Sequence, residues 1–144
     1  MDKIIKKAKF LLISIFLCCV SFYSTTVFAL STDWVINDKS KVRLISSKTN
    51  SDNLDEIFLG LEYQLETGWK TYWKSPGGGG FPQKINWSNS ENISELAIDW
   101  PVPKKFEILG LTSIGYEDNV IFPIELSIID KNKITKINLN TNYL

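Results

Sequence analysis

The sequence predicts an all-β protein, an antiparallel β-sandwich that follows a cleaved signal peptide. Three observations lead to this prediction. Apolar and polar residues alternate over short stretches, of which residues 59–66 are the clearest. Turn-forming residues separate these stretches at regular spacing. No segment carries a sustained apolar period of 3.6 residues with caps, so helix content should be low.

The first 29 residues have the layout of a signal peptide. Four lysines precede an uncharged run from Phe10 to Leu30, and Val27 and Ala29 are small enough for the −3 and −1 positions of a cleavage site. Cleavage after Ala29 is therefore expected. An uncleaved anchor is the alternative, because about 20 uncharged residues can span a bilayer. We assign residues 1–29 to the signal peptide and residues 30–144 to one β-sandwich domain.

Charge and cysteine content exclude several classes of protein. The whole chain has 16 basic and 16 acidic side chains. Removal of residues 1–29 takes away four lysines and Asp2, so the remaining domain has 12 basic and 15 acidic side chains. A nucleic-acid binder would usually be more basic. The chain has no histidine, and Cys18 and Cys19 both lie in the leader. The domain after residue 29 therefore has neither histidine nor cysteine. Without these residues the usual acyl-transfer and zinc sites cannot be assembled, so we predict no metal and no cofactor.

The first half of the domain contains three expected strands. Residues 41–46 form the first, and residues 59–66 form the second, with Leu61 and Tyr63 on its buried face. Gly68 supplies a turn, and residues 69–74 form a third strand that carries aromatic side chains on both faces. Pro76 ends that strand, and the four glycines at 77–80 are expected to form a flexible hairpin tip.

The second half alternates in the same way. Strands are expected over residues 84–88, 96–100, 120–128 and 134–144. Pro123 suggests that the third of these lies at a sheet edge or contains a bulge, because proline cannot donate to a ladder. Residues 104–113 are expected to form a loop that is unusually rich in apolar side chains.

Two groups of residues have alternative interpretations. Glu62 with Glu66, or Glu117 with Asp118, have the residue types of a glycosidase pair, although solvated strand faces are the commoner explanation. The second group is a set of aromatic side chains that would serve either as a stacking platform for a sugar or partner chain or as core filling: Trp69, Tyr72, Trp73 and Trp87. The glycine run lacks the lysine and helix of a phosphate-binding loop.

Four motifs resemble one known family. They read GWKTYWKSPG at 68–77, WPVP at 100–103 followed by Phe106, GLTSIGY at 110–116, and VIFPI at 120–124. In order and spacing the chain resembles the N-terminal periplasmic domain of the thiol:disulfide interchange protein DsbD, particularly its ScsB-like branch. The resemblance implies an immunoglobulin-like β-sandwich in the periplasm, in a parent protein of the inner membrane. It also implies protein-disulfide reductase chemistry, with cytochrome c maturation as one setting.

The resemblance further implies where the reactive cysteines belong. The family has a closely spaced cysteine pair after the strand that corresponds to residues 137–144. We therefore expect the pair to lie beyond Leu144, so that the 144 residues contain no catalytic residue and are incomplete at the C-terminal end of the sandwich. Without a thiolate the chain is expected to be redox-inactive as given.

Two further features of the family can be carried over to this chain. A cap loop that shields the cysteines would correspond to Phe106, Glu107, Ile108, Leu109 and Gly110. Ile108 replaces the aromatic residue usual at the tip of that loop. Trp69 and Tyr72 would be the pocket aromatics beside the pair.

The two functional hypotheses belong to different classes. In the first, the domain exchanges electrons with a membrane-embedded domain and a thioredoxin-like domain of the same system and passes them to periplasmic client proteins, with no role for nucleic acid. In the second, it is a non-catalytic exported β-sandwich that binds a glycan or a partner protein through its aromatic surface.

Overall fold

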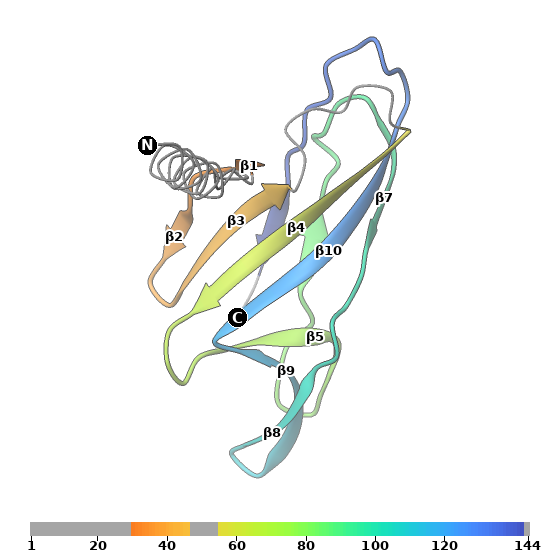
Figure 1. Cartoon of the computed structure of the whole chain (residues 1–144). Helices are drawn as coiled ribbons and strands as arrows, with labels where there is room; N and C mark the ends of the chain where they lie inside the picture. Colours follow the sequence, from red (N-terminus) through yellow and green to blue (C-terminus); the bar gives the residue numbers. More distant parts are fainter. Residues whose placement is uncertain (1–29, 47–54, 143–144) are drawn as a thin grey trace, which may run out of the picture.

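The computed structural model describes residues 30–46 and 55–142, which form strands and no helix (Figure 1). Within these ranges no helix is long and apolar enough to cross a membrane. The predicted all-β class is therefore confirmed. The strands are β1 (Leu30–Ser31), β2 (Val35–Asn37), β3 (Ser40–Ser46), β4 (Glu56–Leu65), β5 (Lys70–Gly77), β6 (Lys84–Asn86), β7 (Ile93–Ile98), β8 (Lys104–Ile108), β9 (Leu111–Glu117), β10 (Asn119–Ile128) and β11 (Asn140–Asn142).

The strands form two layers, as predicted for a sandwich. One layer is a large antiparallel sheet in the order β1-β3-β4-β10-β7, with β2 also paired to β3. Two smaller sheets form the other layer: β5-β9-β8, and β11 with β6. Side chains join the layers. The Tyr63 hydroxyl of β4 lies 2.7 Å from the Thr141 hydroxyl of β11, and the Tyr116 ring of β9 packs on Phe122 of β10.

The pairing of β4 with β10 forms the centre of the core. The register aligns Val120 with Tyr63 and Phe122 with Leu61, so that the apolar residues of both strands face the second layer. These side chains are at most 8% exposed, as the alternation predicts. Burial of each large apolar side chain contributes about 1.5–3 kcal/mol, so this pair of strands supplies much of the stability of the domain.

Phe122 is the contact point of the aromatic side chains. Its ring meets Tyr63, Trp100 and Tyr116 edge to face, at centroid distances of 5.5, 5.3 and 5.1 Å. Such pairs add about 0.5–1.5 kcal/mol beyond area burial. The Tyr116 hydroxyl donates a 2.8 Å hydrogen bond to the carbonyl oxygen of Pro101, and burial raises the pKa of Tyr116 to about 12.

The sheet-edge prediction for Pro123 is wrong, and the register shift that β10 does contain lies at Ser127 and Ile128, against β7, not at Pro123. β10 lies between β4 and β7, and Pro123 pairs with Gly60 of β4 in an unbroken register. The carbonyl oxygen of Pro123 accepts a hydrogen bond from the Asp99 amide, on the β7 side. Because the N–H and C=O of one residue in an antiparallel strand point to the same neighbour, the missing donor faces the end of β7. The ladder to β4 therefore loses nothing.

Two other element predictions need correction. Residues 104–113 form most of a β-hairpin, β8–β9, instead of a loop, and residues 134–139 precede the short strand β11 instead of belonging to it. In the first case the apolar residues of the expected loop pair across the hairpin, with Ile108 opposite Leu111.

Two predictions concern residues outside the described ranges. The predicted signal peptide, with Cys18 and Cys19, is one of them. The other is the end of the last expected strand, which was predicted to continue to Leu144. The described part of that strand, β11, ends at Asn142, and Leu144, beyond which the cysteine pair is expected, lies outside the described residues.

We expect Tyr116→Phe to lower the free energy of unfolding by about 1 kcal/mol, because the Pro101 carbonyl loses its donor while the ring contact is kept. Because the pKa of Tyr116 is raised in the folded state, the free energy of unfolding also depends on pH. The stabilising contribution of the protonated Tyr116 is fully present below the unfolded-state pKa of about 10 and is lost as pH rises through 12. Urea unfolding of both proteins between pH 7 and 12 measures this. A fall in stability between pH 10 and 12 that is identical in both proteins would contradict the assignment.

Candidate functional site

The three-stranded sheet β5-β9-β8 carries most of the predicted site residues. Tyr72 pairs with Gly115, and Phe106 pairs with Ser113 two residues earlier on β9. Side chains at alternate positions share one face, so Tyr72, Ser113 and Phe106 lie on the outer face of this sheet. Thr71 and Tyr116 pair with each other and face the core.

The predicted cap-loop residues form the end of β8 and the turn of the hairpin. Leu109 and Gly110 both have a positive φ, 51° and 80°, as a two-residue turn of type I′ requires. Such a turn strongly favours asparagine and glycine, yet a leucine stands first, and its side chain is 98% exposed. Ile108 is half-buried, and Glu107 is exposed. The hairpin therefore presents an apolar tip on a strained backbone.

A cluster of charges joins the three strands beside Phe106. Glu117 accepts a 2.8 Å hydrogen bond from Lys104 and lies 3.8 Å from Lys70. The Lys70 ammonium is 4.7 Å from the centroid of the Phe106 ring. The hydrogen bond from Lys104 is the main cause that holds the pKa of Glu117 below its usual range, and the same bond raises the pKa of Lys104. This charge cluster was not predicted, because its members meet only through strand register.

The glycine run packs along β9 instead of projecting as the predicted hairpin tip. The Gly78 amide donates a 3.0 Å hydrogen bond to the Thr112 carbonyl. A Cβ at Gly77 would lie 2.6 Å from the same oxygen, one at Gly79 would overlap the Ser113 hydroxyl, and one at Gly80 would overlap the Tyr72 ring. Close backbone approach, and not flexibility, is what these glycines provide. The loop covers Tyr72 and Ser113 on the outer face.

Three buried polar side chains lie around this loop: Thr71, Gln83 and Ser113. The Gln83 amide nitrogen donates to the Thr71 hydroxyl, whereas Gln83 Oε1 and Ser113 Oγ have no partner among the described residues. Gln83 precedes Lys84, which pairs with Asn142 at the end of β11. The C-terminal end of β11 therefore lies close to the inner side of β5.

Trp69 lies apart from the hairpin. Its amide donates to Glu66 in the turn after β4, and the Lys39 ammonium is 5.6 Å from the centroid of its ring. Trp69 is three residues from Tyr72, so in an extended chain the two rings point to opposite faces. The structure thus brings Tyr72 and the hairpin into one sheet and places Trp69 near the ends of β3 and β4.

The other candidate residues are separated or paired. Trp73 packs against the core cluster, and Trp87 is half-buried after β6. Among the carboxylates, Glu62 lies 2.6 Å from Arg43, and Glu66 lies 3.5 Å from Lys39. Each of these two carboxylates faces a cation on the neighbouring strand or turn, which is the arrangement of an ordinary strand surface.

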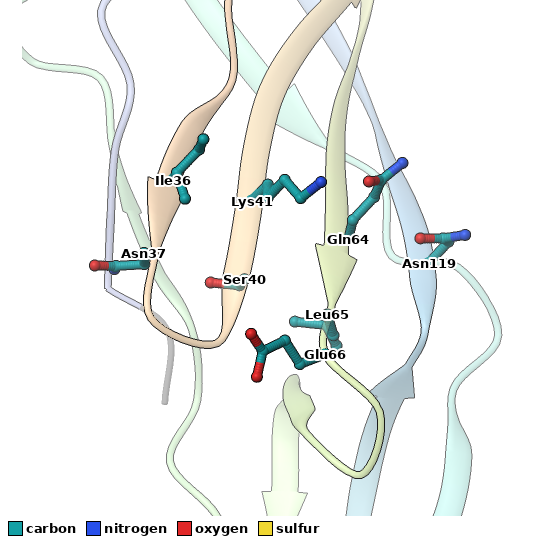
Figure 2. A pocket seen from close by; sticks show the side chains of 8 residues that line it. All are labelled: Ile36, Asn37, Ser40, Lys41, Gln64, Leu65, Glu66 and Asn119. Carbon is teal, nitrogen blue, oxygen red and sulfur yellow. The ribbon is translucent and has the colours of Figure 1, made fainter.

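A polar pocket of about 350 Å³ lies at the ends of β2, β3 and β4, and Glu66 is the one candidate residue in its lining (Figure 2). Ser40 is 3% exposed there, and its hydroxyl has no partner among the described residues. Lys41 and Gln64 lie side by side on paired strands, while Glu66 is already bound to Lys39. The pocket offers no nucleophile with an adjacent base. It is lined by Ile36, Asn37, Ser40, Lys41, Gln64, Leu65, Glu66 and Asn119.

Comparison with known proteins now identifies the family. The family described as "Thiol:disulfide interchange protein DsbD, N-terminal" matches residues 41–144. The chain belongs to this family. It is also similar to the crystal structure of the N-terminal periplasmic domain of ScsB from Proteus mirabilis, with 31% identity and a TM-score of 0.58 over 81% of this chain and 51% of that chain. The chain thus spans about half the length of that relative. No curated protein sequence matches it.

This result confirms the predicted resemblance to the DsbD N-terminal domain and to ScsB. The immunoglobulin-like sandwich expected from the family is also confirmed, because the matched fold is all-β with antiparallel sheets packed in two layers. The chain is homologous to a periplasmic domain of a thiol-disulfide interchange system.

We expect Gly80→Ala to destabilise the domain by about 1–3 kcal/mol, because the new methyl group overlaps the Tyr72 ring. Gly78→Ala is the matched control: at that position a Cβ has no neighbour closer than 3.9 Å, so its stability should rise slightly or stay within about 0.5 kcal/mol. Urea unfolding measures both. Equal effects of the two substitutions would show that the glycine run is not packed on Tyr72.

Leu109→Asn should stabilise the domain by about 0.5–1 kcal/mol, since asparagine tolerates the positive φ of this turn and the exposed leucine loses little packing. Ile134→Asn is the control, because Ile134 is 91% exposed and its φ is not positive. Thermal unfolding measures both variants. A loss of stability at Leu109, or an equal gain at Ile134, would rule out strain at the hairpin tip.

Proposed function

We propose that this chain is the N-terminal domain of a protein-disulfide reductase that relays electrons to exported proteins, with cytochrome c maturation as one setting. The family match over residues 41–144 is the observation on which this proposal rests. The likeness to a periplasmic ScsB domain supports the same location. Export through a signal peptide at 1–29, and attachment of a longer parent protein to the inner membrane, are parts of the proposal.

The exchange reaction needs a thiolate that attacks a disulfide sulfur. Residues 30–144 contain no cysteine, so this segment by itself is redox-inactive. The proposed parent protein therefore supplies the reactive pair from residues beyond Leu144. The contribution of the present segment is the scaffold and the surface around that pair.

The position of β11 supports a location for the pair. Asn142 pairs with Lys84, and the neighbouring Gln83 is hydrogen-bonded to Thr71 of β5. A cysteine pair following β11 would approach the edge of the β5-β9-β8 sheet. Tyr72 and the hairpin tip from Phe106 to Gly110 would then form one side of its surroundings, in the role of pocket wall and cap. Trp69 would lie at the margin, since it packs with Lys39.

The proposed partners are the membrane-embedded and thioredoxin-like domains of the same system, together with periplasmic client proteins. Each must bring a sulfur atom to the pair, and therefore must dock near the end of β11. The exposed side chain of Leu109 gives the hairpin tip an apolar contact surface. Partner docking at this end of the domain is the testable content of the proposal.

An introduced thiol tests this docking. We expect Asn142→Cys to react with a thioredoxin-like domain, activated as a mixed disulfide with thionitrobenzoate, at least about tenfold faster than Asn132→Cys. Tenfold corresponds to about 1.4 kcal/mol of docking free energy. The introduced thiolate attacks the partner's sulfur and releases the thionitrobenzoate anion, whose absorbance gives the rate. Asn132 is the control because it is exposed in the turn after β10. That turn lies at the opposite end of the molecule from the β8–β9 hairpin (Figure 1).

Each rate is divided by the rate of the same variant with free dithiobis-nitrobenzoate, which removes differences in thiol reactivity. Leu109→Asn in the Asn142→Cys background should lower the normalised rate, because it removes apolar contact surface from the hairpin tip. Equal normalised rates at the two positions would refute docking at the end of β11.

A further inference from the structure

The outer face of the large sheet, which points away from the second layer, carries an apolar patch at its centre. Paired residues of β3, β4 and β10 form rows across this face, and successive rows are two residues apart along each strand. The central row is Ile45, Gly60 and Pro123. Phe58 and Ile121 lie one row away on either side and are 57% and 45% exposed. We call these five residues the outer-face patch. A sheet with one face in the core normally carries polar side chains on the other, so the patch marks a contact surface.

Gly60 makes the apolar surface of the patch continuous. A Cβ at this position would lie 2.8 Å from the Ile121 side chain and 2.9 Å from the Ile45 side chain. The two isoleucines therefore close over the glycine from the strands on either side. No side chain projects from the middle of the patch, which suits the flat face of another sheet, packed about 10 Å away.

The two ends of the outer face carry opposite charges. Lys41 lies two rows from Gly60 at one end. Glu56 and Glu95 lie two rows from the central row at the other end, on either side of Ser127. Lys41, Glu56 and Glu95 are exposed, and none of them forms an ion pair with another residue in the described ranges. The face is therefore basic at one end, apolar in the centre and acidic at the other end.

We propose that the outer-face patch is the interface of a homodimer of this chain. A two-fold axis in the plane of the interface crosses the strands at the central row, so the strands of the two copies run in opposite directions. Each patch then covers the same patch of the other copy. The rotation also places Lys41 of each copy at the acidic end of the other, beside Glu56. In such an interface every contact between two different residues occurs twice.

The rows next to the centre also complement each other in this arrangement. Phe58 of one copy lies opposite the row that contains Arg43 and Glu62 in the other. Arg43 is already 2.6 Å from Glu62, and its guanidinium lies 4.3 Å from the centroid of the Trp34 ring. A planar guanidinium stacks readily on aromatic rings, so Phe58 gains a partner without leaving a charge unpaired.

The charges favour a second copy over a lipid bilayer as the partner. The anionic headgroups of a bilayer would repel the acidic end of the face, where Glu56, Glu95 and Glu125 are all exposed. A second copy brings Lys41 to that end instead. The dimer also leaves the β8–β9 hairpin and the end of β11 free, so this inference goes beyond the proposed function and does not depend on it.

Sedimentation equilibrium of the exported chain tests the dimer. We expect a reversible monomer–dimer equilibrium with a dissociation constant on the order of 10–100 μM, because the patch contains few large side chains. Ile121→Lys should weaken the association at least about tenfold, since it places two charges in the apolar centre. Ile134→Lys is the matched control: Ile134 is 91% exposed and lies outside the patch, so this variant should associate as the parent does. Thermal unfolding shows whether each variant is folded.

Charge reversal tests the orientation of the two copies. Lys41→Glu and Glu56→Lys should each weaken self-association about tenfold at low salt, because each homodimer then contains two like-charge contacts. An equimolar mixture of the two variants should associate as the parent does, since every acid then meets a lysine of the other variant.

Several outcomes would overturn the proposal. These are a monomer at all concentrations up to about 1 mM, parental association of the Ile121→Lys variant, loss of association in the Ile134→Lys variant, and a mixture of the two charge variants that associates no better than either alone. Binding of the monomer to vesicles of anionic lipid in place of dimerisation would assign the patch to a membrane and would also overturn it. The thiol test at Asn142 is unaffected by any of these results, so the two proposals fail independently.

Discussion

The edge-to-face packing of three aromatic rings on Phe122 is the interaction on which the rest of this domain depends. Tyr63 belongs to the same sheet as Phe122, but Tyr116 belongs to β9 in the second layer, and Trp100 lies in the connection between β7 and β8. The second layer consists of two small sheets, of three and two strands. The Phe122 contacts therefore hold the β5-β9-β8 sheet in place on the large sheet.

This attachment explains the use of small residues further along β9. Tyr116 fixes one end of the strand in the core, and nearer its other end the strand passes beneath the glycine run at Thr112 and Ser113. A Cβ at Gly115 would overlap the Thr71 carbonyl, so the close pairing of β5 with β9 depends on that glycine. The same closeness lets the glycine run lie over Tyr72. A bulky β9 would separate these strands and remove the covered surface beside the hairpin.

The sequence was most informative where burial alone decides the structure. Residues 59–66 and 120–128 alternate so regularly that their strands and buried faces could be predicted, and the family motifs led to the fold and the family. Contacts between distant residues could not be predicted in this way. Leu109 gives no turn signal, so the hairpin was missed. The glycine run suggested flexibility because its neighbours Thr112, Ser113 and Tyr72 are brought to it only by the pairing of β5 with β9.

β9 has a stable end and a strained end, and this contrast suits the partner docking that we propose for this surface. At Tyr116 the strand is buried and hydrogen-bonded to Pro101, whereas five residues earlier it emerges at Leu111, which is 50% exposed and follows the strained turn at Leu109. Local opening costs least where few apolar contacts and exposed hydrogen bonds hold the chain. The hairpin tip can therefore open while Tyr116 and Phe122 stay packed. A partner that pushes the tip aside would work against the local contacts of the turn, and not against the stability of the whole sandwich.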